Sequence, residues 1–473
     1  MSNPMLYCPA CDSLHDPASG LFSCPGTGDG REHILDLRLD PGRELPGEIL
    51  KHWANHGSDP LLAFAPLGAT CPLAGETTYA GLVRSLQDGL DRHEGRRLAV
   101  SPLVDTPELA GAIGHAGRLA LKDETGQPGG SHKARHLAGT MLYLEALRRD
   151  GPRRPLAISS CGNAALAAAC VARASGYELT AFVPGDVHPE VAAMLSERGA
   201  RVSVTPRLST GVGDPCYLAF REAVKAGAAP FCCSGRDNWS NIEGGRSLGF
   251  EAALQWRASG GAPDHLVLQT GGGALARSVA SAFEEMERLG FMDKTPRVHA
   301  CQTEGAFPFA RAWLSLLTEV SAAAGVKLPA PGSLDEVRDI LAGDGLVAGA
   351  VEYAREKFSG AAVQDALRRA VLAPSRFMRP WDGPVPRSLA HGILDDETYD
   401  WFFLARAMLR TGGRCVIAPE PLVARAHALA LKNTGVKVSA TGSAGLAGLM
   451  ALREAGAVKP SESACLFFTG INR

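Results

Sequence analysis

The sequence has no run of about 18 apolar residues, the length that a membrane-spanning helix requires. Its first residues, MSNPMLYCPACDS, contain neither the apolar core of a secretion signal nor an arginine-rich amphipathic leader. No long basic run is present, and the formal net charge is -2 at pH 7, so nothing favours a nucleic-acid partner. These absences predict a cytoplasmic protein that acts on neither membranes nor nucleic acids.

The chain is longer than one hydrophobic core usually supports, and two or three domains are expected from its 473 residues. Hydrophobic residues make up 45% and charged residues 21%, the usual balance of a globular protein. The sequence pattern divides into an N-terminal appendage at 1–45, a large domain formed by 46–145 and 240–473, and a small α/β domain at 146–239.

Apolar segments of strand length alternate with segments of helical periodicity along most of the chain. The expected strands are 118–122, 156–159, 179–183, 201–205, 230–233, 265–269, 297–301, 414–417 and 465–468. The expected helices are 132–149, 163–174, 188–198, 214–226, 274–289 and one beginning at Glu420, with an uncertain helical insert between 320 and 395. This alternation predicts an α/β fold with two parallel-sheet domains. Ligands of such sheets bind beyond the carboxyl ends of the strands.

Lys133 stands in a polar, glycine-rich loop after the strand at 118–122, where a helix is expected to begin. The positive end of the helix dipole disfavours a charged ammonium group, and a neutral amine is the form that makes an imine with a carbonyl. The alternative is an ordinary solvated lysine, the usual state of this residue. The loop alone leaves both interpretations open.

Three further loops follow strands in the same way. Ser160-Cys161-Gly162-Asn163 begins a helix, where backbone N–H groups either bind an anion or are simply capped. The glycines of 270–275 allow several N–H groups to converge on one anion, although glycine triplets also arise by chance. Thr469 ends the last strand, where its hydroxyl either meets a ring nitrogen or forms a plain polar terminus.

These loops resemble, in order and spacing, those of the fold type II enzymes that use pyridoxal 5′-phosphate (PLP). That family includes threonine synthase, serine/threonine dehydratase, cysteine synthase and the tryptophan synthase β-subunit. The resemblance extends from about residue 106 to the end of the chain. The matching residues are Thr106-Pro107, Lys122-Asp123-Glu124, Ser131-His132-Lys133, Ser160-Cys161-Gly162-Asn163, Thr270-Gly271-Gly272-Gly273 and Phe468-Thr469-Gly470.

The resemblance implies a role for each matching residue. Lys133 would hold PLP as a Schiff base and move the substrate's α-proton, and Asn163 would bond the 3′-oxygen of the ring. Thr469 would face the ring nitrogen, and a neutral partner there suits elimination and replacement chemistry. The other implied contacts are Gly271, Gly272, Gly273, Ala274 and Leu275 for the cofactor phosphate, His132 and Ser443 for the cofactor, and Ser131, Ser160, Gly162 and Asn163 for the substrate.

Two features are similar to threonine synthase in particular, namely the segment 241–251 and the cysteine-rich appendage. The neighbours of Lys133 differ, because threonine synthases usually have Phe before the lysine and Asp-Arg after it. His132 is more like tryptophan synthase β, where the histidine lies against the cofactor phosphate; the alternative is that His132 has no chemical role.

The predicted function is therefore a PLP-dependent lyase of the threonine synthase or amino-acid ammonia-lyase type. It would perform β- or γ-elimination, with or without replacement, on a small substituted amino acid. The alternatives are threonine synthase, which converts O-phosphohomoserine to threonine, and a non-catalytic scaffolding relative. Threonine synthase needs a second anion site, for which the candidates are Arg135, Arg246, Arg376 and Arg379. A homodimer is expected from the family and from the prevalence of symmetric dimers.

The acidic segment 388–400 is interpreted as a solvated surface, although Ser388 and His391 could face the substrate.

Cysteines at the N-terminus suggest a zinc site. Cys8 and Cys11 form a C-x2-C pair, and Cys24 follows, but a structural zinc ion normally has four protein ligands. His15 or His33 could supply the fourth ligand; the alternative is a degenerate ribbon held by packing. In a chain without an export signal, the other members of the twelve cysteines are expected to be reduced thiols.

Overall fold

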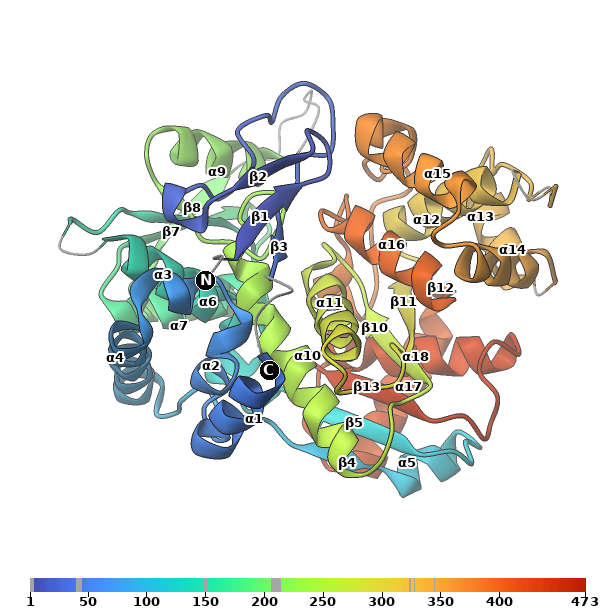
Figure 1. Ribbon diagram of the computed structural model, residues 1–473, viewed down its shortest axis with the longest axis horizontal. Helices are drawn as coiled ribbons and strands as arrows, with labels where there is room; N and C mark the ends of the chain where they lie inside the picture. The colour runs from blue at the N-terminus through green and yellow to red at the C-terminus, as the bar shows by residue number, and fades with distance from the viewer. Residues whose placement is uncertain are drawn as a thin grey trace.

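The computed structural model describes residues 4–39, 45–148, 151–205, 214–322, 325–326, 328–343 and 345–473, and three sheets organise them (Figure 1). The largest sheet has the order β12 (Cys415–Ala418), β11 (Arg297–Thr303), β10 (His265–Gln269), β13 (Ala464–Phe468), β5 (Leu119–Asp123) and β4 (Leu103–Asp105). All its neighbouring strands are parallel except β4, which is antiparallel to β5. Strands β10 and β13 are buried at every residue because helices cover both faces.

The second sheet is smaller and entirely parallel. Its order is β8 (Arg201–Thr205), β7 (Leu179–Pro184), β6 (Leu156–Ser159) and β9 (Ala229–Pro230). The predicted α/β fold with parallel sheets is confirmed, but the strand predicted at 230–233 was wrong in its extent. The backbone N–H of Phe231 still donates to Ala157 O of β6 (2.9 Å), but Asn238 Nδ2 takes the carbonyl oxygen of Pro230 (2.7 Å), and β9 ends at Pro230.

Eighteen α-helices are described, and most of them cover the two parallel sheets. They are α1 (Leu45–His56), α2 (Pro60–Ala63), α3 (Thr70–Ala74), α4 (Glu76–Glu94), α5 (Pro107–Ala112), α6 (Lys133–Arg148), α7 (Asn163–Ser175), α8 (Pro189–Glu197), α9 (Pro215–Lys225), α10 (Ser240–Ala258), α11 (Ala274–Arg288), α12 (Pro308–Ala322), α13 (Leu334–Ala342), α14 (Gly345–Glu356), α15 (Ala361–Leu372), α16 (Trp401–Thr411), α17 (Glu420–Thr434) and α18 (Ala440–Glu454). The uncertain insert is the group α13–α15, which packs against α12 and α16 at one end of the molecule (Figure 1).

Apolar side chains form separate cores for the two parallel sheets. The core of the small sheet also includes side chains from the segment 61–98 and from α6, so helices that precede this sheet in sequence complete its packing. The domain boundaries at 145–146 and 239–240 remain predictions.

The N-terminal segment forms a third, antiparallel sheet of order β2 (Ser13–His15), β1 (Met5–Cys8) and β3 (Asp36–Arg38). It docks on the rest of the chain through backbone carbonyls. Tyr143 donates its hydroxyl to Pro17 O (2.8 Å), and Trp239 Nε1 donates to Leu21 O (2.8 Å). In Figure 1 this module, drawn in dark blue, lies near the top of the view, above the label of α6.

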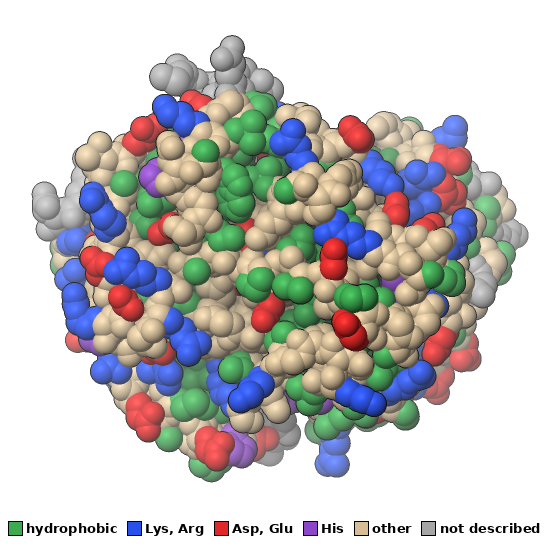
Figure 2. All heavy atoms as spheres, turned by 90° about the horizontal axis from the view of Figure 1, so that it is seen from below, with side chains coloured by type: hydrophobic (Ala, Val, Ile, Leu, Met, Phe, Trp, Pro, Cys, Tyr) green, Lys and Arg blue, Asp and Glu red, His purple; other side chains and the backbone are tan. Residues whose placement is uncertain are grey.

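Acidic and basic side chains are interspersed over the face drawn in Figure 2 and form no single basic patch there. Among the described residues, no helix is both long enough and apolar enough to cross a bilayer.

Four completely buried charged side chains join β5, α6 and α10. Lys122 pairs with Glu251, and Arg135 bridges Glu251 (Nη1–Oε2, 2.9 Å) and Glu124 (Nε–Oε2, 2.7 Å). Lys122 also donates to Ser101 O (2.6 Å). Burial lowers the pKa of Lys122, and the Glu251 carboxylate opposes that shift. Two positive and two negative groups balance, so the network is stable only while all four are present.

We predict that Glu251→Gln destabilises the protein by about 3–5 kcal/mol, because two buried cations would then share one carboxylate. The matched control is Asp88→Asn, which removes a carboxylate from an exposed pair with Arg97 and should cost less than about 1 kcal/mol. Guanidinium unfolding followed by circular dichroism measures both. Similar small losses in the two variants would show that the network contributes little.

Candidate active site

The Lys133 loop is fastened to the end of β13. Ser131 pairs with Gly470 as an isolated antiparallel bridge. The backbone N–H of His132 and its Nδ1 both donate to Thr469 O, each at 3.1 Å. Because β5 and β13 are adjacent parallel strands, their following loops leave the same edge of the sheet. Lys133, the first residue of α6, directly follows His132 and is therefore held close to Thr469.

Thr469 is held by a residue that the sequence analysis missed. Gln269, at the end of β10, donates through Nε2 to Thr469 Oγ1 (2.7 Å), Phe467 O (3.0 Å) and Gly442 O (2.9 Å). Since Oγ1 accepts from Gln269, the Thr469 hydroxyl proton remains to be donated elsewhere. A polar side chain at the end of the apolar strand HLVLQ was the only sequence signal for Gln269.

Ser443, which the resemblance implies as a further cofactor contact, forms hydrogen bonds within its own helix α18. Its hydroxyl donates to Ser439 O (3.1 Å) and lies 3.3 Å from Nδ1 of His427. Of the two hydroxyls, that of Thr469 is therefore the one that remains available to donate to a ring nitrogen.

The glycine loop after β10 begins helix α11 and is covered by a distant segment. Gly273 has a φ of 95°, a left-handed conformation that favours glycine. Thr398 donates its hydroxyl to Gly271 O (2.7 Å), and the N–H of Asp400 donates to Gly272 O (3.0 Å). A side chain at Gly271 would collide with the carboxylate of Asp395. The segment 393–400 therefore lies directly on the loop.

Asp395 projects into the space between the predicted site loops. Its carboxylate accepts the N–H of Gly272 and lies in the electric field of Lys133, and its charge acts on the Cys161 thiol of the Ser160 loop. Burial raises the pKa of Asp395 to about 6, although Lys133 and the Gly272 N–H partly oppose that rise.

The interpretation of 388–400 as a solvated surface was wrong for two of its acidic residues. Asp395 faces the site, and the completely buried Asp400 pairs with Arg277 (2.8 Å). His391 is exposed, and Ser388 Oγ accepts the N–H of Ala390 (3.0 Å). Only the three-dimensional packing brings this segment to the glycine loop.

The Ser160 loop ends at Asn163, the first residue of α7. Ser160 Oγ accepts the N–H of Gly162 (3.3 Å). Arg473 Nη1 donates to Asn163 Oδ1 (2.6 Å), so the amide nitrogen Nδ2 is turned inward, where a Cβ on Gly470 would approach it to 2.7 Å. Asn163 thus presents a hydrogen-bond donor next to Thr469.

Two polar atoms beside Lys133 are buried without a partner among the described residues: Ser131 Oγ and His132 Nε2. Burial, reinforced by the charge of Lys133, lowers the pKa of His132 to about 3, so the ring is neutral near pH 7. Because the Nδ1 proton is donated to Thr469 O, Nε2 carries a lone pair. The ring therefore accepts a hydrogen bond at this position, which does not favour a contact with an ionised phosphate.

The four arginines considered for a second anion site make their described contacts elsewhere. Arg135 belongs to the buried network, and Arg246 stacks over Phe250 (4.9 Å to the ring centre). Arg376 pairs with Glu319 at the surface (3.1 Å), and Arg379 is exposed.

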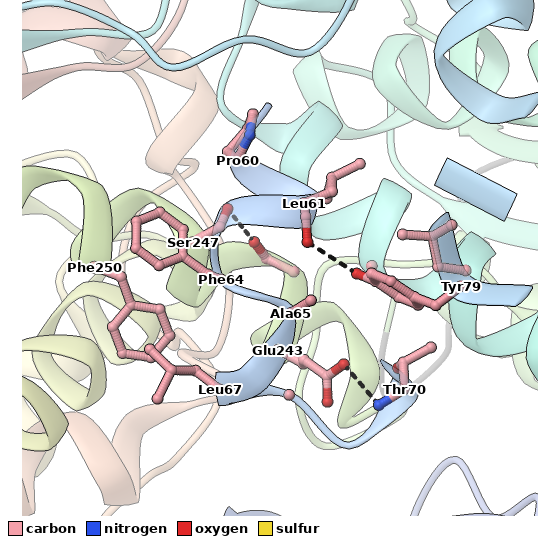
Figure 3. Close-up of a pocket in the computed structure, with 14 residues that line it drawn as sticks. Pro60, Leu61, Phe64, Ala65, Leu67, Thr70, Tyr79, Glu243, Ser247 and Phe250 are labelled. Carbon is pink, nitrogen blue, oxygen red and sulfur yellow. Dashed lines mark hydrogen bonds between the residues drawn. The ribbon is translucent and has the colours of Figure 1, made fainter. Parts of the chain in front are cut away.

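A separate apolar pocket lies between α2, α6 and α10 (Figure 3). Its half-buried carboxylate, Glu243, accepts the backbone N–H groups of Ala69 (2.7 Å) and Thr70 (3.2 Å), and the dashed line in Figure 3 marks the contact with Thr70. Glu243 therefore holds the start of α3. The residues that line this pocket come from none of the four predicted site loops.

Comparisons with known proteins agree with this architecture. Residues 96–355 match the family described as pyridoxal-phosphate dependent enzyme. A serine dehydratase-like protein of Homo sapiens is 32% identical over 196 residues, which cover 40% of this chain and 53% of that protein. A threonine synthase of Synechocystis is 25% identical over 50% of this chain and 61% of that protein. The matched segments thus span only about half to three-fifths of these two relatives.

A solved structure, a threonine deaminase from T.th., superposes with a TM-score of 0.54 at 22% identity, covering 83% of this chain and 98% of that one. The chain belongs to the PLP-dependent enzymes of fold type II, and the predicted cofactor is confirmed by this membership.

The Lys133 loop, the Ser160 loop, the glycine loop and the loop at Thr469 meet in one region, called here the loop junction. The residues at this junction fit PLP. The glycine loop already gives an N–H to the Asp395 carboxylate, which shows that it accommodates an anionic oxygen. Thr469 keeps a hydroxyl proton for the ring nitrogen, and Asn163 presents an amide nitrogen for the ring oxygen. The individual residue assignments remain proposals.

We predict that Thr469→Val raises the Kd for PLP about tenfold, because leaving the buried ring nitrogen without a donor costs about 1–3 kcal/mol. Ser443→Ala should change this Kd less than about twofold, since a lost contact within its own helix does not touch the ring. Fluorescence titration of the cofactor-free protein with PLP measures both. A larger effect from Ser443→Ala would reverse the assignment.

We also predict that Asp395→Asn tightens PLP binding at pH 8 by about 1 kcal/mol, or roughly fivefold in Kd. At that pH the carboxyl is ionised and repels the cofactor phosphate. At pH 5, below its pKa of about 6, the carboxyl is mostly protonated, and the two proteins should converge. The exposed neighbour Asp396→Asn is the control. Equal affinities of the wild type and Asp395→Asn at pH 8 would contradict the placement of Asp395.

Proposed function

We propose that this protein is a PLP-dependent lyase that removes a β- or γ-substituent from a small amino acid, with Lys133 as its catalytic residue. The observation that carries the proposal is the convergence of Lys133, the Thr469 hydroxyl and the glycine loop at the carboxyl edge of one sheet. When bound there, PLP would withdraw electrons from the substrate's α-carbon.

Each residue of the junction has a defined task in this proposal. The Lys133 amine holds the cofactor and then accepts the α-proton at Nζ. The N–H groups at the start of α7, with Ser160, bind the substrate carboxylate. Thr469 donates to the ring nitrogen as a neutral partner, which leaves the ring a moderate electron acceptor.

The charges around the site favour a neutral or cationic leaving group. Asp395 is one acidic side chain between the loops, and a carboxyl group with a pKa of about 6 can donate a proton to a departing hydroxyl or amine near neutral pH. A phosphate group would instead meet a like charge; of the four candidate arginines, Arg135 and Arg376 are paired with carboxylates, Arg379 is exposed, and Arg246 lies over the ring of Phe250. The similarity to a serine dehydratase-like protein also supports a leaving group other than phosphate.

Threonine synthase remains the second candidate, because threonine synthases of Synechocystis and Mycobacterium tuberculosis are also similar to this chain. It would require a phosphate-binding site made by residues other than the four arginines. A scaffolding role is disfavoured by the retained Lys133. A homodimer stays an expectation.

The proposed function is tested by a product panel. Serine, threonine, 2,3-diaminopropionate, O-phosphoserine and O-phosphohomoserine would be assayed for ammonia, keto acid and phosphate. We expect ammonia and keto acid from at least one substrate with a hydroxyl or amino substituent, and no turnover by Lys133→Ala. Lys432→Ala, which alters an exposed lysine on α17, is the control. Formation of phosphate and threonine from O-phosphohomoserine would replace the proposal with threonine synthase.

A further inference from the structure

Three thiols and one imidazole converge in the N-terminal module. The Sγ atoms of Cys8, Cys11 and Cys24 and a ring nitrogen of His33 all lie within 4.8 Å of one another. His33 Nδ1 is 3.5 Å from Cys8 Sγ and 3.4 Å from Cys24 Sγ, and the Sγ atoms of Cys11 and Cys24 are 3.6 Å apart. Tetrahedral zinc would give edges of about 3.8 Å between sulfurs and about 3.6 Å between sulfur and nitrogen.

The backbone around these cysteines is shaped for thiolate ligands. The N–H groups of Ala10 and Cys11 point at Cys8 Sγ, and the N–H of Gly26 points at Cys24 Sγ. A side chain on Gly26 would come within 2.6 Å of the His33 ring, so glycine permits this close approach. The turns after Cys8 and Cys24 thus direct backbone N–H groups toward the two sulfur atoms, an arrangement that stabilises thiolates.

A carboxylate fixes the orientation of His33. Asp29 Oδ1 lies 2.9 Å from His33 Nε2. An ionised carboxylate only accepts, so Nε2 carries the proton and the lone pair of Nδ1 is directed at the sulfurs. Metal-binding histidines characteristically have such a second partner. His15, the other candidate, bonds Ser13 Oγ (2.8 Å), and its Nε2 is 3.9 Å from Cys24 Sγ.

We propose that Cys8, Cys11, Cys24 and His33 bind one structural zinc ion, with Asp29 orienting the histidine. Four protein ligands close the coordination sphere and leave no position for a substrate, which is typical of structural sites. Three sulfurs and one nitrogen select zinc over the hard cations magnesium and calcium.

The zinc site would support the cofactor loops through the residues that flank His33. Glu32 accepts from Trp401 Nε1 (2.8 Å), and Leu35 O accepts from Arg277 Nη2 (2.8 Å). Arg277 also pairs with Asp400, which belongs to the segment that covers the glycine loop. A zinc ion bound by His33 would therefore hold in place the start of β3, which Arg277 contacts at Leu35 and Asp36.

Metal content tests the site directly. Protein purified and reconstituted with zinc under reducing conditions should hold about one zinc ion per chain by mass spectrometry. His33→Ala and Cys24→Ser should lose this zinc, whereas His15→Ala and His33→Cys should retain it, because a thiolate can replace the imidazole. Absence of zinc from the wild type, a Cys11–Cys24 disulfide under reducing conditions, or loss from His15→Ala but not from His33→Ala would overturn the assignment.

Cobalt substitution of the wild-type protein avoids any folding defect of the variants. Tetrahedral thiolate coordination predicts intense visible bands and a thiolate-to-cobalt charge-transfer band; their absence would refute the site. For the support role, complete zinc removal by a chelator should raise the Kd for PLP about fivefold. The same treatment of His33→Ala should have no further effect. An unchanged Kd in the wild type would refute the coupling while leaving the metal site intact.

Discussion

The fold depends on four charged side chains that are completely buried, namely Lys122, Glu124, Arg135 and Glu251. Because water does not reach them, each charge must be neutralised by a partner within this group. They come from the end of β5, the loop after it, and helices α6 and α10. Since an uncompensated buried charge is strongly unfavourable, these elements can pack together in few ways. The first turn of α6, which begins at Lys133, is thereby fixed against the sheet. Arg135 was considered as a phosphate ligand, but its guanidinium group pairs with Glu124 and Glu251 instead.

From that fixed turn, the site is assembled by contacts between strand ends. His132 and Ser131 connect the start of α6 to Thr469 and Gly470, and Gln269 connects Thr469 to the glycine loop. The segment 393–400 then closes over that loop, and Arg277 links it to the N-terminal sheet. Segments from both ends of the chain are therefore linked to the glycine loop. This explains how Asp395, far from Lys133 in sequence, enters its electric field.

Local patterns made a large part of this architecture predictable. β8 and β10 have the expected bounds, because the β-branched and apolar residues that favour a strand lie within a few positions of one another in the sequence. Lys133 and the glycine loop could be found because each lies where a strand gives way to a helix. Gln269 and Asp395 could not, since their roles depend on packing between distant segments, and an acidic run such as 388–400 has the composition of a surface. The choice of His33 over His15 likewise depends on the turn that brings Asp29 and Gly26 to the imidazole.

The central claim is that Lys133 carries the cofactor at this junction. Borohydride reduction of the PLP-loaded protein, followed by peptide mass spectrometry, tests it most directly. The account predicts one pyridoxyl group per chain on the peptide containing Lys133. Modification of a different lysine, or none in a protein that binds PLP stoichiometrically, would contradict it.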